Sequence, residues 1–202
     1  MKLFYSPGAC SLSPHIVSRE AGIPVELQKV DLKARRYDGG ADYTKINAKG
    51  YVPALQLDSG QVLTEGPAIV QYLADQKPDA RLAPKPGSFE RYQLQEWLNF
   101  IGTELHKGFS PLFRPNTPDE YKRIAKENLA TRIDWLDKQL DGRDFLMGKN
   151  FSVADAYAFT ILSWSKPLQI DLSRWPNVTA YLARVGARPR VQEALKAEGL
   201  VK

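Results

Sequence analysis

The sequence predicts a small α/β domain followed by an all-helical domain. Over about the first 75 residues, short apolar strands alternate with helices in the order β-α-β-α-β-β-α. A stretch rich in proline and glycine at residues 78–87 separates this region from one in which apolar residues recur at helical spacing. We therefore expect a first domain over residues 1–80, a linker over 81–86 and an all-helical domain over 87–202.

The chain begins with a strand, a turn and a helix. We expect a strand over Lys2–Tyr5 and a helix over Ser11–Glu20, which Gly22 and Pro24 bring to an end. The only cysteine of the chain, Cys10, lies in the turn between these two elements.

The rest of the first domain is expected to complete a small mixed sheet. Residues 25–30 alternate well enough to predict a second strand, and a short helical piece is expected over 42–46. Residues 51–57 and 61–64 flank an Asp-Ser-Gly turn, a pattern typical of a hairpin. A helix over 67–74 follows, with a proline at its first position, where no backbone N–H is needed.

The second region is predicted to be helical throughout. Apolar residues over 89–105 recur at helical spacing, and another helix is expected over 119–140. The Ser-Val-Ala-Asp pattern beginning at Ser152 is a capping box, and it starts a helix that is apolar on nearly all sides. Two shorter helices, over 177–187 and 190–198, complete this domain.

Composition excludes several classes of protein. The 202 residues are 43% hydrophobic and 25% charged, as in an ordinary globular protein, and no apolar run approaches a membrane span. One cysteine forms no internal disulfide and favours a reducing compartment, so we expect a cytoplasmic protein. The 28 basic residues are dispersed among 23 acidic ones, which favours a mixed solvated surface over a nucleic-acid groove but suits a small anionic ligand. His15 and His106 lie far apart in the sequence, so no metal site is expected.

Cys10 is the first candidate functional residue. It follows a Ser-Pro-Gly turn and precedes a predicted helix, whose unpaired N–H groups favour an anion. The thiolate is the reactive form of cysteine, and a helix N-terminus lowers the pKa of a cysteine below its usual value of about 8.5. The alternative is a small buried apolar residue, as many free cysteines are. From this turn alone both interpretations stay open.

The position of the thiol gives the first domain the outline of the thioredoxin fold. The thiol stands at the first strand–helix turn, and Val52-Pro53 precedes a later strand. In that fold a second thiol normally completes a Cys-x-x-Cys pattern, whereas this chain has Ser13 there. Disulfide exchange within the chain is therefore excluded, while chemistry at a single thiol is not.

Three stretches of the chain occur together in one known family. They are the opening segment Lys2–His15, the segment Gly50–Leu55 and the Phe-Ser-Val-Ala-Asp box at 151–155. Through them the whole chain resembles bacterial glutathione transferases, specifically the cysteine-containing beta class. The resemblance implies a cytoplasmic homodimeric enzyme of detoxification. Glutathione would be its co-substrate, no metal would be needed, and the second substrate would be an electrophilic, mostly apolar small molecule.

The resemblance also implies which residues bind glutathione. Cys10 would lie near the glutathione sulfur. The backbone of Val52, before a cis-Pro53, would bind the cysteinyl unit, and the carboxylate of Glu65 would bind the γ-glutamyl ammonium. Cys10 and His106 are the implied catalytic residues. The other positions implied for the glutathione site are Arg35, Gly66, Asn99, Thr103, Glu104 and His106, with contributions across a dimer interface.

Two positions depart from the family pattern. Gly66 stands where a serine hydroxyl usually binds the γ-glutamyl carboxylate, and one lost hydrogen bond costs about 0.5–1.5 kcal/mol. We therefore expect weaker glutathione binding. Arg35 replaces the usual lysine, which keeps the charge but exchanges a point charge for a planar fork. Binding need not suffer if Arg35 pairs with the glycyl carboxylate.

The long helix supplies the remaining candidates. Asn99, Thr103 and His106 fall at i, i+4 and i+7, which predicts one helical face. For Asn99 and Glu104 the alternative is a solvated helix surface, and for His106 it is a satisfied core or surface histidine. With an ordinary pKa near 6.5, His106 has the chemistry to hydrogen-bond a thiolate or to orient water. Lys107 adds a positive charge that favours an anionic sulfur.

Three functional hypotheses remain open at this point. Cys10 either hydrogen-bonds the glutathione thiolate during conjugation or forms a mixed disulfide with it. The second case describes a glutaredoxin-like thiol transferase or a reductive dehalogenase. Ser11 either donates to the thiolate or caps its helix. A hypothesis of another class is a non-catalytic ligand carrier or a transcription-associated binding protein on the same fold.

Overall fold

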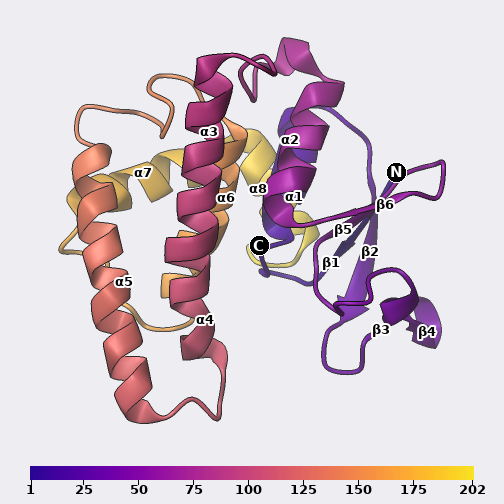
Figure 1. Ribbon diagram of the computed structural model, residues 1–202, viewed down its shortest axis with the longest axis horizontal. Coiled ribbons are helices and arrows are strands. Elements are labelled where there is room, and N and C mark those ends of the chain that lie inside the picture. Colours follow the sequence, from indigo (N-terminus) through magenta and orange to yellow (C-terminus); the bar gives the residue numbers. More distant parts are fainter. The chain divides into compact units, whose positions relative to one another are not determined.

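The computed structural model describes all 202 residues, which form two compact units (Figure 1). Unit 1 comprises Met1–Ala83 with Arg188–Lys202, and unit 2 comprises Pro84–Ala187. The break between Ala83 and Pro84 falls inside the linker predicted over residues 81–86. None of the helices combines the length and the apolar composition that a membrane span requires.

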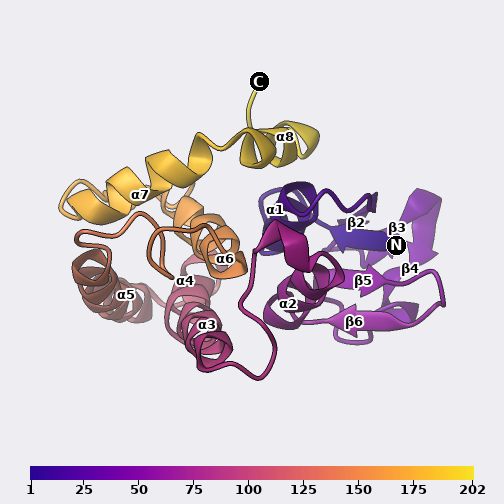
Figure 2. The ribbon, with the colours of Figure 1, turned by 90° about the horizontal axis from the view of Figure 1, so that it is seen from above.

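The last helix, α8 (Pro189–Ala197), belongs to unit 1, although the sequence placed it with the helical domain. It packs against α1 (Leu12–Glu20), as Figure 2 shows. Arg188, just before α8, donates two hydrogen bonds of 2.7 and 2.8 Å to the carboxylate of Glu20 at the end of α1. Such a paired guanidinium–carboxylate contact adds geometric specificity to the packing.

A six-stranded mixed sheet forms the centre of unit 1, in the order β4-β3-β2-β1-β5-β6. β1 and β2 are parallel, with Leu3 opposite Leu27, whereas β5 runs antiparallel to both β1 and β6. Helices α1 and α2 (Gly66–Gln76) lie side by side next to the sheet (Figures 1 and 2). The strands are β1 (Lys2–Tyr5), β2 (Glu26–Asp31), β3 (Arg36–Tyr37), β4 (Ala41–Asp42), β5 (Ala54–Gln56) and β6 (Val62–Thr64).

The segment between β2 and β5 differs from the prediction. The helical piece expected over 42–46 is a single 3-10 turn, Tyr43–Lys45, and the short strands β3 and β4 precede it. Gly39 and Gly40 have positive φ values of 72° and 120°, so the chain reverses there and β3 pairs with β4. Alternation over strands of two residues is too short to detect in a sequence.

A buried cluster joins the sheet to the segment before Pro53. It consists of Phe4, Val30, Tyr43, Val52 and Ala54. The Tyr43 hydroxyl donates a 2.8 Å hydrogen bond to the Tyr51 carbonyl. Burial raises the pKa of Tyr43 to about 12, so this hydroxyl remains a donor at all ordinary pH values. The cluster therefore fixes the backbone around Val52 relative to the end of β1.

Unit 2 is all-helical, and α6 (Val153–Leu162) is its buried centre. The capping box predicted at Ser152 is confirmed, because the Ser152 N–H donates to Asp155 Oδ2 at 2.8 Å. Leu146 N–H and the Tyr181 hydroxyl donate to Asp155 Oδ1 at 2.8 and 3.0 Å. The other elements of unit 2 are α3 (Phe89–Phe100), a π-helical segment (Ile101–His106), α4 (Lys107–Phe113), α5 (Asp119–Gln139) and α7 (Pro176–Gly186). Short 3-10 turns lie at Asp38–Gly40 and Pro78–Ala80 in unit 1 and at Ser163–Ser165 in unit 2.

Candidate active site

Cys10 lies half-buried in the turn between β1 and α1. Its Sγ donates a hydrogen bond of 3.2 Å to the carbonyl of Val52. The Val52–Pro53 peptide bond is cis, as the resemblance implied. The Val52 N–H makes no hydrogen bond within the chain. One point of unit 1 therefore presents a thiol beside an unpaired backbone donor.

Ser11 does not cap α1, whereas its role as a donor to the thiolate stays a prediction. Its hydroxyl donates to the Ser6 carbonyl at 3.2 Å and accepts from the Ser6 N–H at 3.1 Å, and it makes no capping hydrogen bond. The first N–H groups of α1 also find partners, because Leu12 N donates to Ala9 O and Ser13 N to Cys10 O. The helix start therefore offers Cys10 fewer unpaired N–H groups than the sequence suggested.

The turn that carries Cys10 is attached to the end of the chain. Gly8 N donates to Glu198 Oε2 at 2.9 Å, and His15 Nδ1 lies 2.9 Å from Glu198 Oε1. Both side chains of the His15–Glu198 pair are fully buried. Burial, together with the negative charge of Glu198, raises the pKa of nearby Tyr5. Sequence reasoning missed Glu198, which lies 183 residues from His15 in a polar helix end with no distinctive motif.

Glu65 occupies a restrained position at the start of α2. Its φ of 72° lies in the left-handed region that side chains rarely adopt. Strain of this kind concentrates at functional sites, where the surrounding structure holds it in place. The Glu65 carboxylate forms an ion pair with Lys49, whose ammonium also donates to Thr64 Oγ1 at 3.0 Å. Lys49 is a contact of the candidate site that the sequence did not indicate.

Gly66 lies where α1, α2 and the cis-proline meet. A Cβ atom at Gly66 would stand 3.8 Å from Ser13 Oγ and 3.9 Å from Pro53 Cγ, which are ordinary contact distances. Its N–H is the first of α2 and makes no hydrogen bond within the chain. The space and the unpaired donor together allow a ligand oxygen, or a small side chain, at this point.

Arg35 lies next to Gly50, which stands two residues before Val52 in the sequence. A Cβ atom at Gly50 would stand 3.2 Å from Arg35 Nε, so the guanidinium covers this glycine closely. Gly50 has a φ of 71° and Arg35 a φ of 54°, so both backbones are left-handed. The structure therefore brings Cys10 and Gly66 to Val52-Pro53, and it places Arg35 against Gly50.

The predicted single face of Asn99, Thr103 and His106 is wrong. A π-helical turn spans Ile101–His106, and Lys107 N bonds to Gly102 O, five residues back. Thr103 stays close to Asn99, because its hydroxyl donates to the Asn99 carbonyl at 3.0 Å. A π turn inserts about one extra residue, and one residue of an α-helix spans about 100°, so His106 is rotated away from that face.

His106 faces α6 within unit 2. Its Nδ1 lies 2.7 Å from the Tyr157 hydroxyl, and its ring meets the Trp164 ring edge-on with the centroids 5.0 Å apart. Phe109 and Phe113 also pack edge-on against Trp164, at 6.0 and 5.2 Å. His106 is therefore a half-buried histidine with a hydroxyl partner and an aromatic surround.

The remaining candidates of unit 2 are more exposed. Glu104 pairs with Arg132 of α5 at 2.6 Å, which gives it a structural partner within the same unit. Asn99, Thr103 and Lys107 are exposed. Their roles in glutathione binding stay predictions.

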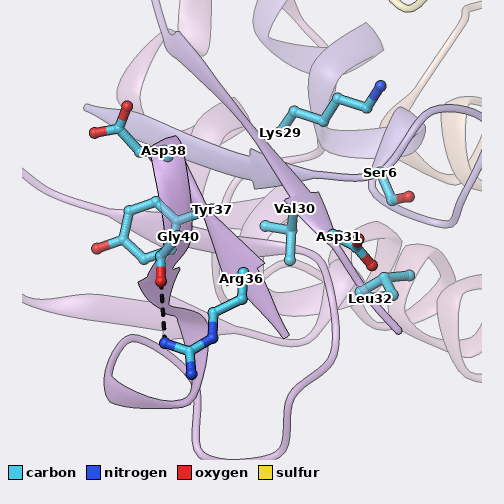
Figure 3. A pocket seen from close by; sticks show the side chains of 10 residues that line it. Ser6, Lys29, Val30, Asp31, Leu32, Arg36, Tyr37, Asp38 and Gly40 are labelled. Atoms are coloured by element: carbon cyan, nitrogen blue, oxygen red, sulfur yellow. Dashed lines mark hydrogen bonds between the residues drawn. The ribbon is translucent and has the colours of Figure 1, made fainter. Parts of the chain in front are cut away.

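A cavity of about 510 Å³ lies at another place in unit 1 (Figure 3). Arg36 Nη1 donates to Gly40 O at 3.0 Å across one side of it. No residue predicted to bind glutathione lines this cavity. Its walls are formed by Ser6, Lys29, Val30, Asp31, Leu32, Arg36, Tyr37, Asp38, Gly39 and Gly40.

The fold and the site define the class of protein. Residues 8–76 match the family model "Glutathione S-transferase, N-terminal domain", and residues 100–189 match "Glutathione S-transferase, C-terminal domain". The predicted fold class, a thioredoxin-like domain with an all-helical domain, is thereby confirmed. A cis-proline turn beside a thiol at the first strand–helix turn agrees with it.

Three known proteins are similar along their full length. The glutathione S-transferase GstA of Escherichia coli O157:H7 is 49% identical over 200 residues, which cover 99% of this chain and 100% of that protein. A bacterial beta class glutathione S-transferase of Sphingomonas chungbukensis is 52% identical with a TM-score of 0.96, and a sphingomonad glutathione S-transferase complexed with glutathione is 51% identical with a TM-score of 0.96. Both structures cover 100% of this chain, and this chain covers 100% of each. The chain belongs to the glutathione S-transferase family, and its predicted resemblance to the bacterial beta class is confirmed.

Proposed function

We propose that this glutathione transferase joins glutathione to electrophilic, mostly apolar small molecules, with the glutathione sulfur beside Cys10. The observation that carries the proposal is the 3.2 Å contact between Cys10 Sγ and the Val52 carbonyl. It brings a thiol to the same backbone segment that offers an unpaired N–H. A thiol-containing peptide lying along this segment would have its own sulfur next to Cys10.

Each end of glutathione has a matching group in unit 1. The Glu65 carboxylate suits the γ-glutamyl ammonium, and the Gly66 N–H at the start of α2 suits the adjoining carboxylate. The Val52 N–H and carbonyl suit the cysteinyl unit, and the Arg35 guanidinium suits the glycyl carboxylate. The Glu65 carboxylate would then have two positive partners, because the incoming ammonium would share it with the ammonium of Lys49.

Glutathione binding would also change the partner of Cys10. A cysteinyl N–H donating to the Val52 carbonyl competes with the Cys10 thiol for the same oxygen. A thiol released from this carbonyl is a donor for the glutathione thiolate. The thiolate then attacks the electrophilic carbon, a carbon–sulfur bond forms, and the leaving group departs with the electron pair of its broken bond. The protein contributes by favouring the ionised sulfur and by holding the two reactants together.

The family resemblance also supports proposed roles for residues of unit 2. The His106 ring packs against Trp164, which in turn packs against Phe113, and these are the surroundings of a group that meets an apolar electrophile or the sulfur attacking it. Lys107 favours an anionic sulfur, and Thr103 is proposed to reach the γ-glutamyl end. We further propose that the enzyme is a cytoplasmic homodimer, as the resemblance implies. The sphingomonad relative, whose structure is a complex with glutathione, supports glutathione as the co-substrate.

The Cys10→Ala variant tests the proposal. Conjugation of glutathione to a halo-aromatic substrate should survive with reduced kcat/KM, because the thiol only hydrogen-bonds the reacting sulfur. Cys10→Ser, which keeps a donor, should retain more of the rate than Cys10→Ala. Complete loss of conjugation in both variants would show that Cys10 reacts covalently and would contradict the proposal.

Three further measurements separate the rival hypotheses. Incubation with glutathione disulfide lets a Cys10 thiolate attack one sulfur, form a mixed disulfide and release one glutathione thiolate, and mass spectrometry detects the adduct. Turnover of mixed disulfides that disappears in Cys10→Ala would favour a thiol transferase. Failure of the wild-type protein to bind immobilised glutathione under reducing conditions would favour a non-catalytic protein.

A further inference from the structure

The contact between His106 and Tyr157 has a consequence for the chemistry of the histidine. His106 Nδ1 and the Tyr157 hydroxyl oxygen are 2.7 Å apart, a short hydrogen-bond distance. The two rings stand nearly perpendicular, at 81°, with their centroids 5.9 Å apart. Only one imidazole nitrogen is thereby engaged by the hydroxyl, and Nε2 lies on the opposite side of the ring.

Tyr157 is held in one position by the helix that carries it. It is 3% exposed and lies on α6, in which every residue is buried. The capping box at Ser152 and Asp155 fixes the start of this helix one turn before Tyr157. A hydroxyl on such a helix is preorganised, so it can orient a more mobile partner.

The π-helical turn brings His106 to this hydroxyl. Without the extra residue of the turn, His106 would point toward the face of Asn99. Gly102, within the same turn, lies next to this hydroxyl, because a Cβ there would stand at the ordinary contact distance of 3.7 Å from the hydroxyl oxygen. Turns of this type are frequent at functional sites.

The direction of the hydrogen bond follows from acidity. A neutral imidazole has one nitrogen that donates and one that accepts. A phenol is a stronger acid than the N–H of a neutral imidazole, and the imidazole nitrogen is a better acceptor than a phenol oxygen. The Tyr157 hydroxyl therefore donates to Nδ1, and the ring proton stays on Nε2.

We propose that Tyr157 is a positioning residue that holds neutral His106 as the Nε2–H tautomer, so that His106 acts as a hydrogen-bond donor. This inference rests on the proposed function for its catalytic consequence: a donor stabilises an anionic sulfur or a departing anion. His106 is then no general base, because its only basic nitrogen is occupied by Tyr157.

Nitrogen-15 NMR of the imidazole rings tests the tautomer directly. The chain has only two histidines, so the spectrum contains two ring systems, and His106→Asn assigns them. His15 serves as an internal reference for the opposite tautomer. Its Nδ1 faces the Glu198 carboxylate at 2.9 Å and its Nε2 accepts from Arg19 Nε at 3.4 Å, an arrangement that requires Nδ1–H.

At a pH where the nitrogen shifts show both rings to be neutral, we expect Nε2–H for His106 and Nδ1–H for His15. Tyr157→Phe should convert His106 to a mixture of tautomers. Tyr181→Phe is the matched control: it also removes a buried hydroxyl of unit 2, which donates to Asp155 at 3.0 Å, and it should leave the His106 tautomer unchanged. An Nδ1–H tautomer in the wild type, or an unchanged tautomer in Tyr157→Phe, would overturn the inference.

Kinetics separate this inference from the proposed function. Loss of one such hydrogen bond should lower kcat/KM for conjugation about fivefold in Tyr157→Phe, while the KM for glutathione stays nearly constant. His106→Asn should lose at least as much. If His106→Asn keeps full activity while the NMR shows the expected tautomers, the catalytic role of His106 fails but the positioning by Tyr157 stands.

Discussion

Gly66→Ser should strengthen glutathione binding. The glycine is buried and begins α2, with an N–H that makes no hydrogen bond within the chain. A Cβ at this position would meet Ser13 Oγ at 3.8 Å and Pro53 Cγ at 3.9 Å, so the new side chain fits without displacing a neighbour. Its hydroxyl would add a second donor beside the backbone N–H for the γ-glutamyl carboxylate.

The size of the effect follows from one hydrogen bond. A neutral donor contributes about 0.5–1.5 kcal/mol, and a charged acceptor raises the gain toward 1.5–3 kcal/mol. The dissociation constant of glutathione should therefore fall about 2- to 13-fold for a neutral hydrogen bond and about 13- to 160-fold for one to a charged acceptor. The hydroxyl of Ser13, close to the new side chain, is a competing partner that would bring the gain to the lower end of this range.

Calorimetric titration of glutathione measures this change, and Gly66→Ala is the matched control. Alanine adds the same Cβ and the same restriction of the unfolded chain without the hydroxyl. The affinity difference between the serine and alanine variants isolates the hydrogen bond. Equal dissociation constants for these two variants would refute the assignment of Gly66 to the carboxylate of glutathione.

Three other changes have defined outcomes. Glu65→Gln removes the charge proposed for the γ-glutamyl ammonium and should raise the glutathione dissociation constant about tenfold; a titration that shows no change contradicts that role. Glu198→Ala leaves the buried His15 side chain without its carboxylate partner. It should lower the free energy of unfolding by about 3–5 kcal/mol, which denaturant unfolding measures. Trp175 Nε1 donates a 2.6 Å hydrogen bond to Asp134, which lowers the pKa of this carboxyl below its usual value of 3.8. The pair therefore stabilises the folded state above about pH 3.8, and this stabilisation is lost as the pH falls through the lowered pKa. In Asp134→Asn the free energy of unfolding should therefore fall less steeply as the pH is lowered. An unchanged dependence of the free energy of unfolding on pH would contradict this expectation.

Local patterns in the sequence predicted most of the fold. The capping box at Ser152 depends on residues three apart, and such a pattern specifies a helix start by itself. The strand–turn–helix around Cys10 and the hairpin after Pro53 were recognisable for the same reason. Together they identified unit 1 and the turn that carries Val52, and thus most of the candidate site in that unit.

The sequence does not predict features that depend on contacts between distant residues or on an interruption within a helix. The π turn before His106 leaves no signature in helical spacing, because the apolar residues of the long helix continue through it. The Glu198 carboxylate joins the turn at Gly8 to α1, and only the folded chain brings these parts together. Local propensity contains no information about such pairs, so α8 was assigned to the helical domain rather than to unit 1.

The reason for regarding Cys10 as reactive changes with the structure. The sequence suggested that unpaired N–H groups at the start of α1 favour its thiolate, yet Leu12 and Ser13 already use theirs within the turn. The Cys10 thiol itself donates a hydrogen bond to the Val52 carbonyl. This contact supports the proposal in which Cys10 is a hydrogen-bond donor, and the mixed-disulfide hypothesis is left to the glutathione disulfide experiment. A donor at this point needs an anionic sulfur to accept from it, and among the proposed ligands only glutathione supplies one.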